Sequence, residues 1–225
     1  DGEEIPNSGT VMVENINVGK LKHSKVPVYR RNIGVVFQDF RLLPRMTIFE
    51  NIAFALEVIG MKKVDIRRRV REVLELVSLQ DKAKAFPDEL SGGQQQRATI
   101  GRAIANHPKV LIADEPTGNL DSKNTLEVMN IIKSISEEKL VILVTHEEQL
   151  ADFYESRIIR IRDGKVISDE INEHADNLDY RIENKIYLKD IRDHKRLKTD
   201  HYNVDFYNES GGDLDLDIVI RNGNI

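Results

Sequence analysis

The stretch that decides the fold runs from Leu90 to Asp121 and reads LSGGQQQRATIGRAIANHPKVLIADEPTGNLD. A glycine pair opens it, an apolar run ending on two acids lies in its middle, and a polar turn closes it. Glycines at helix starts and polar residues after buried strands are features of proteins that bind phosphate groups. The order of these signals therefore predicts a nucleotide-handling α/β protein. The signals are Leu90–Gln94, Val110–Glu115 and Gly118–Asp121.

The first signal predicts the start of a helix that faces a phosphate group. Ser91, Gly92 and Gly93 precede a helical pattern that we expect over residues 94–107. The first backbone N–H groups of a helix have no internal partner, and the helix dipole adds positive charge there. Glycines let a phosphate approach the backbone closely. The alternative is an ordinary serine cap before a surface helix.

The second signal predicts a buried strand with two acids at its end. Four apolar residues, Val110–Ala113, are followed by Asp114 and Glu115. Apolar runs of this kind are typical of parallel strands buried on both faces, and ligands bind at the carboxyl ends of such strands. Asp114 is therefore placed to reach Mg²⁺, through a water that the ion retains.

Two further apolar runs end on polar residues in the same way. Ile33–Phe37 is followed by Gln38, and Val141–Val144 is followed by Thr145 and His146. The carboxyl ends of parallel strands meet at one edge of a sheet. We therefore expect the polar residues after all three strands to lie along one edge, although a lone histidine after a strand is often structural.

These motifs together resemble the nucleotide-binding subunits of ABC transporters, whose signature is LSGGQ, here Leu90–Gln94. The resemblance covers residues 5 to about 170. It implies a P-loop NTPase-type α/β domain over residues 1–170, with a helical subdomain over about 41–107. It also implies ATP and Mg²⁺ as cofactors, ATP hydrolysis, and a head-to-tail homodimer that closes on ATP.

The resemblance assigns a role to each motif residue. In the dimer, Ser91–Gly93 of one protomer closes over ATP held by the other, and Asp121 couples the two sites. Gln38 and Asp114 would be the Mg²⁺ ligands, with Gln38 also sensing the membrane partner. The implied catalytic residues are Glu115, which polarises water, and His146, which contacts the γ-phosphate; the implied nucleotide-binding residues are Gln38, Ser91, Gly92, Gly93, Gln94 and Asp121.

Two segments narrow the resemblance to FtsE-type cell-division ATPases and their lipoprotein-release and macrolide-export relatives. They are QDFRLLP at Gln38–Pro44 and PTGNLD at Pro116–Asp121. This subgroup implies an integral membrane partner, an FtsX-like permease, that holds the chain at the inner face of the plasma membrane. Alternatives are a related export ATPase, a soluble ABC ATPase acting on DNA or ribosomes, and a non-catalytic remnant. The soluble class carries coiled coils, cysteine zinc sites or two cassettes, which this sequence lacks.

One family motif has no match in the 225 residues. The phosphate loop G-x-x-x-x-G-K-[ST] is absent, because Gly19-Lys20 and Gly164-Lys165 lack both the upstream glycine and the Ser/Thr. Residues Glu3–Val11, EEIPNSGTV, resemble the segment that follows the phosphate-loop helix in the family. We therefore expect a chain truncated at its N-terminus that hydrolyses almost no ATP in this form.

The helical subdomain is predicted from periodicity and caps. A helix over Thr47–Gly60 has Thr47 as its N-cap, with Glu50 completing a capping box, and ends at Gly60. A second helix is expected over Asp65–Leu79. Its arginine-rich face is either a lipid or partner contact or, as we favour, a solvated surface.

The loop before the first of these helices is unusually apolar. We expect two or three of its large side chains to be exposed and to receive the membrane partner, with the rest packed under the helix. These side chains are Phe40, Leu42, Leu43, Met46 and Phe49.

Downstream of the polar turn, we expect a helix over Ser122–Glu137 with Ser122 as its N-cap. A hairpin of strands at Arg157–Ile161 and Lys165–Ser168, turning at Asp163-Gly164, should follow.

The composition of the chain argues against several kinds of site and partner. The chain contains no cysteine, which removes disulfides and thiolate zinc sites. A net charge of −5 provides no basic field that favours nucleic acid, so none is expected as a partner. No apolar run approaches the roughly 18 residues of a membrane span, and no signal peptide is seen, so we expect a soluble, cytoplasmic protein.

Residues 171–225 form an extension outside the resemblance, with β character and no assigned role. Leu214–Ile220 alternates apolar residues with aspartates, which predicts a half-buried strand. The aspartate face is more consistent with solvent than with Ca²⁺, since the EF-hand pattern is absent.

Overall fold

The computed structural model describes residues 6–13, 15–172, 195–198 and 203–206. The chain divides into two compact units, residues 1–177 and 178–225. The described helices of the first unit are α1 (Val26–Arg30), α2 (Ile48–Val58), α3 (Lys63–Leu76), α4 (Gly92–Ile104), α5 (Ser122–Ser136) and α6 (Glu148–Tyr154). Its strands are β1 (Met12–Val13), β2 (Ile16–Asn17), β3 (Ile33–Val36), β4 (Val110–Asp114), β5 (Leu140–Val144), β6 (Arg157–Arg162) and β7 (Lys165–Ile171).

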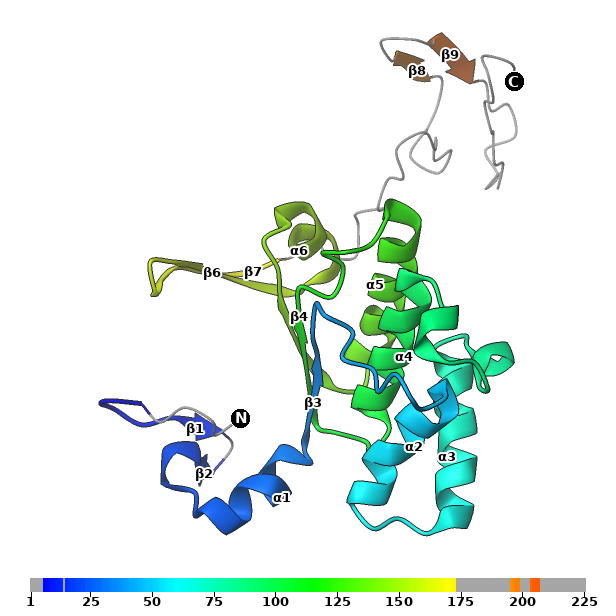
Figure 1. Ribbon diagram of the computed structural model, residues 1–225. Coiled ribbons are helices and arrows are strands. Elements are labelled where there is room, and N and C mark those ends of the chain that lie inside the picture. The colour runs from blue at the N-terminus through cyan, green and yellow to red at the C-terminus, as the bar shows by residue number, and fades with distance from the viewer. Residues whose placement is uncertain (1–5, 14, 173–194, 199–202, 207–225) are drawn as a thin grey trace. The chain divides into compact units, whose positions relative to one another are not determined.

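A parallel sheet of three strands positions the rest of the first unit (Figure 1). The strand order is β3-β4-β5, so the middle strand is the one that ends on Asp114. Val36 pairs with Ala113, and Ala113 pairs with Leu143. The three predicted strands therefore exist, run in the same direction and end at the same edge.

One face of this sheet is covered by α4 and α5 (Figure 1). The covered face carries Gly34, Val36, Leu111 and Ala113, all buried. Gly34 is needed there, because a Cβ atom at this position would lie 2.5 Å from the backbone oxygen of Ala103 in α4. This close approach fixes α4 against the sheet.

The prediction that the strands are buried on both faces is wrong for the part of the chain that the structure describes. Leu140, Ile142 and Val144 of β5 are 61%, 45% and 48% exposed. They alternate along the strand, so they share the face opposite the helices. The apolar runs signalled strands correctly, but an apolar run alone does not show what covers each face.

Helices α2, α3 and α4 pack together into the helical subdomain (Figure 1). Helix α2 begins at the predicted capping box: Glu50 N–H donates to Thr47 Oγ1 (3.3 Å), and Thr47 N–H donates to a Glu50 carboxylate oxygen (2.8 Å). It ends before Gly60, whose φ is +80°. The apolar residues fully buried on these helices are Ile48, Ile52, Leu56, Val70, Val73, Ala98 and Ile100.

Helix α4 overlaps the signature helix predicted over residues 94–107, but both of its ends differ. It begins two residues earlier, at Gly92, and stops at Ile104 rather than His107. The helical path ends where His107, with φ at +53°, precedes Pro108, and the Arg69 guanidinium of α3 donates to the carbonyls of Ile104 and Ala105 at this end. Helix α3 itself is shifted in the same way, starting at Lys63 and ending at Leu76.

Helix α5 begins at Ser122 as predicted, but its N-cap is Asp121, not Ser122. Asp121 Oδ1 accepts from the backbone N–H of Asn124 at 2.9 Å. A carboxylate forms this cap well because it also meets the positive end of the helix dipole.

After α6, strands β6 and β7 form the predicted antiparallel hairpin. Its turn residues Asp163 and Gly164 both have positive φ, 50° and 71°, as a tight hairpin turn requires. No helix in the described ranges is long and apolar enough to cross a membrane.

The second unit contains an antiparallel pair of strands, β8 (Lys195–Lys198) and β9 (Asn203–Phe206). The strand predicted over residues 214–220 lies outside the described residues.

Candidate active site

The sheet brings the predicted site residues to one edge. Asp114 is the last residue of β4, Gln38 follows β3, and His146 follows β5. Because these strands are parallel and in register, the three loops leave the same edge. Gln38, Asp114 and His146 are all exposed there, whereas Glu115 is partly buried.

Glu115 and His146 are in direct contact. Glu115 Oε1 lies 2.7 Å from His146 Nδ1, and the same oxygen accepts from the His146 backbone N–H at 3.0 Å. The hydrogen bond to Glu115, followed by the charge of that carboxylate, raises the pKa of the His146 imidazole. The Glu115 carboxylate is therefore held at the end of β5. The sequence Asp114-Glu115 alone does not reveal this contact.

The backbone of Glu115 is in the left-handed region, with φ at +46°. A residue with a side chain is costly in this conformation and persists where its surroundings fix it. Here its N–H donates to the Val144 carbonyl at 2.8 Å, and its carbonyl accepts from Gly118 N–H at 3.2 Å. The turn after β4 is thus tied both to β5 and to the polar turn.

A second pair, which sequence reasoning missed, joins the same two loops. The buried Thr117 hydroxyl donates to Glu147 Oε1 at 3.1 Å. Thr117 stands two residues after Glu115, and Glu147 directly follows His146. The sequence shows a threonine inside PTGNLD and an acid next to His146, but it does not show that the two side chains meet. Their contact follows from the register of β4 and β5.

Gln38 lies against the polar turn. A Cβ atom at Gly118 would come within 2.8 Å of Gln38 Nε2, and Asn119 Nδ2 donates to the Gln38 carbonyl at 3.5 Å. A hollow of about 460 Å³ opens beside this contact, lined among others by Gln38, Phe40 and Asn119. The glycine at position 118 is what leaves room for the glutamine side chain.

Two oxygen-bearing side chains at this edge are suitable as ligands for a magnesium ion. Gln38 supplies an amide oxygen and Asp114 a carboxylate, the hard ligands that Mg²⁺ prefers. The described residues contain no cluster of three or more His, Asp or Glu side chains that could hold a metal by themselves. Two protein ligands fit an ion that takes its other ligands from water and phosphate oxygens.

The signature residues lie at the start of α4, where Ser91 and Gln94 form a capping box with each other. Their neighbours are the polar turn and α5. A Cβ atom at Gly92 would meet the Leu120 side chain at 3.6 Å, whereas one at Gly93 would lie 2.0 Å from Asn124 Oδ1.

Asp121 is also held by Asn124. Its carboxylate accepts from the backbone N–H of Asn124 at 2.9 Å and from the Asn124 side-chain amide at 2.8 Å. These hydrogen bonds lower the pKa of Asp121. The structure thus places Ser91–Gln94 and Asp121 together through Asn124, whereas Glu115 is paired with His146.

The five apolar side chains expected at the partner contact, four in the loop before α2 and Phe49 in its first turn, are all half-buried. The expectation that two or three of them are exposed is therefore wrong. The Asn51 side chain explains the compact loop, because it accepts from Leu43 N–H at 2.7 Å and donates to the Leu43 and Met46 carbonyls. The exposed large apolar residues of α2 are Phe54, at 41%, and Val58, at 63%.

Comparison with known proteins agrees with this geometry. The sequence profile described as "ABC transporter" matches residues 1–118. The cell division ATP-binding protein FtsE of Streptococcus pneumoniae (strain D39) is 52% identical over 165 residues, which are 73% of this chain and 72% of that protein. FtsE of Bacillus subtilis is 48% identical over 169 residues, 75% of this chain and 74% of the relative.

Solved structures give the same result. The ATP-binding cassette MJ0796, in a dimeric post-hydrolysis state bound to ADP and Pi, superposes with a TM-score of 0.68 and 36% identity. The match covers 76% of this chain and 77% of that one. With its parallel sheet, helical subdomain and signature helix, this chain belongs to the family of ABC transporter ATP-binding proteins.

Proposed function

We propose that the chain is the ATP-hydrolysing subunit of a cell-division ABC complex, acting with an FtsX-like integral membrane partner. The observation that carries the proposal is the edge where β3, β4 and β5 end, with Glu115 Oε1 2.7 Å from His146 Nδ1. The 52% identity to FtsE of Streptococcus pneumoniae supports the cell-division assignment.

In this proposal, Gln38 and Asp114 would hold Mg²⁺, which would neutralise charge on the transferred phosphoryl group. Glu115 orients a water and accepts its proton. His146 keeps the Glu115 carboxylate in place and presents its other ring nitrogen, Nε2, to the γ-phosphate. The left-handed backbone at Glu115 is consistent with a carboxylate fixed for such a role.

The active unit we propose is a head-to-tail homodimer. Ser91–Gln94 lies at the start of α4, where unpaired N–H groups and the helix dipole favour a phosphate. These residues contact Asn124 and the polar turn rather than Glu115 in the same chain. A second protomer would therefore supply the nucleotide that they cover. The dimeric structures of MJ0796 support this arrangement.

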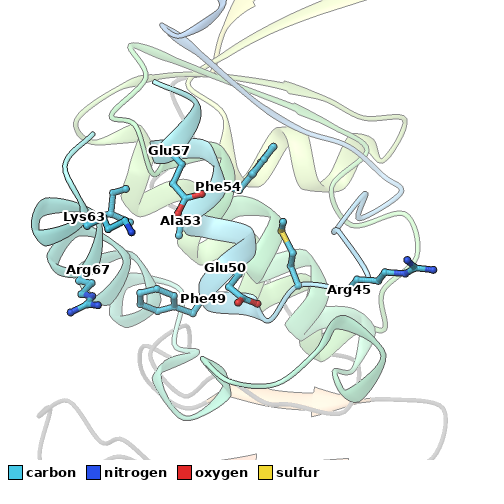
Figure 2. A pocket seen from close by; sticks show the side chains of 10 residues that line it. Arg45, Phe49, Glu50, Ala53, Phe54, Glu57, Lys63 and Arg67 are labelled. Atoms are coloured by element: carbon cyan, nitrogen blue, oxygen red, sulfur yellow. The ribbon is translucent and has the colours of Figure 1, made fainter. Parts of the chain in front are cut away.

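The membrane partner would dock on the helical subdomain. A hollow of about 490 Å³ is lined by Phe49, Ala53 and Phe54 of α2 and by Lys63 and Arg67 of α3, among others. Figure 2 shows Phe49 on the side of α2 that faces Arg67, whereas Phe54 points away from it. Apolar groups surrounded by charged ones are typical of a surface that receives another protein. The chain would then sit at the cytoplasmic face of the plasma membrane through that partner.

A pair of variants tests the docking surface. Phe54→Ser removes an apolar group from the hollow, whereas Val64→Ser removes an even more exposed one, at 72%, outside it. Co-purification with an FtsX-like subunit should weaken about tenfold or more for Phe54→Ser, since buried aromatic anchors are worth about 2 kcal/mol. Val64→Ser should bind normally. Equal binding by both variants would exclude this hollow as the docking surface.

A further inference from the structure

Helix α4 holds the loop after β3 through a row of side chains spaced three residues apart. Gln96, Thr99 and Arg102 all donate to backbone carbonyls within residues 37–41. Residues at this spacing lie on one side of a helix. The bonds are Gln96 Nε2 to the Phe37 oxygen (3.3 Å), Thr99 Oγ1 to the Phe40 oxygen (2.8 Å) and an Arg102 guanidinium nitrogen to the Arg41 oxygen (2.6 Å).

Gln96 differs from the other two because it also reaches the loop after β4. Its Nε2 donates to the Pro116 carbonyl at 2.7 Å, in addition to the Phe37 carbonyl. Two acceptors around one atom require that this atom be the amide nitrogen, which has two hydrogens to donate. Phe37 directly precedes Gln38, and Pro116 directly follows Glu115.

The side chain of Gln96 is fully buried. A buried amide is costly unless it is hydrogen-bonded, and an apolar residue would fill the same place at no such cost. The core packing alone therefore gives no reason for a glutamine at this position. Its two bonds to neighbouring loops give one.

We propose that Gln96 is a positioning residue that sets the spacing between the loop carrying Gln38 and the turn carrying Glu115, and ties both to the signature helix. The role in catalysis rests on the function proposed above. Gln96 lies two residues after the signature residue Gln94, on the same helix. A displacement of α4 would therefore move both loops together.

Hydrogen exchange of the full 225-residue chain without nucleotide tests this proposal. In Gln96→Met, which keeps the length of the side chain but removes the donor, exchange should accelerate in two segments, residues 37–41 and 115–121. Loss of one neutral hydrogen bond corresponds to about a fivefold change in a local opening equilibrium. We expect at least that change in each segment, and a larger change there than in the other segments of the chain.

Thr99→Val is the matched control on the same helix. Of the two loops, Thr99 forms a hydrogen bond only with the one after β3. It should accelerate exchange in residues 37–41 and leave residues 115–121 as they are. If Gln96→Met fails to fold, Gln96→Asn takes its place, since the shorter amide cannot reach both carbonyls. Identical patterns in the Gln96 and Thr99 variants, or acceleration spread evenly over the chain, would overturn the proposal. The measurement uses no ATP, so its result is independent of whether the chain is an ATPase.

Discussion

Glu115 occupies a left-handed backbone position and places its carboxylate 2.7 Å from the His146 ring nitrogen. The two residues come from loops that follow neighbouring strands and are 31 positions apart in the sequence. Their contact joins the loop after β4 to the loop after β5. The hydrogen bond between Thr117 and Glu147 joins the same two loops.

The pairing predicts how His146 titrates. Because Glu115 stabilises the imidazolium, the pKa of His146 in the folded chain is raised above its unfolded value. The resulting stabilisation is fully present below the unfolded pKa of about 6.5 and is lost as the pH rises through the folded pKa. Glu115→Gln should lower the pKa of His146 towards its ordinary value in an NMR titration. An unchanged His146 titration in that variant would refute the pairing.

The buried hydroxyl of Thr117 predicts a measurable effect on stability. Thr117→Val preserves the shape but leaves Glu147 without this donor, which should lower the free energy of unfolding by about 1–2 kcal/mol. Thr117→Ser retains the hydroxyl and should cost less. Urea unfolding of both variants makes the comparison, and a serine variant as unstable as the valine variant would show that packing, rather than the hydrogen bond, is responsible.

At the scale of elements, the starts of α2 and α5 could be predicted, whereas α3 and α4 begin and end two to three residues before the predicted positions. Thr47 with Glu50 and Ser91 with Gln94 are caps made within four residues, so local sequence contains them. The carbonyls at the end of α4 are bound by Arg69, which lies 35 positions before Ile104 and reaches it only in the folded chain. Periodicity cannot detect such a contact.

In the candidate site, too, some features could be predicted from the sequence and others could not. The strand ends carrying Gln38, Asp114 and His146 follow from apolar runs and the geometry of parallel sheets. The roles of Gln96 and Glu147 do not, because each is defined by partners at least 20 positions away. The open face of β5 was missed because strand signals do not show which elements cover a sheet.

The contact between β3 and α4 predicts the effect of adding one methyl group. A Cβ at Gly34 would press against a backbone oxygen, which cannot rotate away, so Gly34→Ala should destabilise the fold by about 1–3 kcal/mol. Gly101→Ala on α4 is the control. Its Cβ would meet only side chains, at 3.1 Å or more, and alanine favours the helix. A Gly34 variant as stable as the Gly101 variant in urea would contradict the close packing of α4 on the sheet.

At the scale of the whole molecule, the chain combines the sheet edge of the proposed active site with a sequence that has no match to the phosphate-loop motif. In the proposed site, Asp114 and Gln38 would hold a magnesium ion, but the 225 residues contain no G-x-x-x-x-G-K-[ST] to anchor the nucleotide that would share it. We therefore expect the described edge to be correctly formed and the chain by itself to show almost no turnover.

A phosphate-release assay on three proteins tests this account most directly. They are the 225-residue chain, the same chain preceded by a phosphate loop and its helix from an FtsE relative, and this fusion with Glu115→Gln. We predict almost no turnover for the first, about 1 s⁻¹ for the second, near the low end of ordinary enzymes, and a loss of about 100-fold or more for the third, since a general base contributes at least that much. Hydrolysis by the Glu115→Gln fusion at the rate of its parent would contradict the assignment of Glu115 and, with it, the proposed active site.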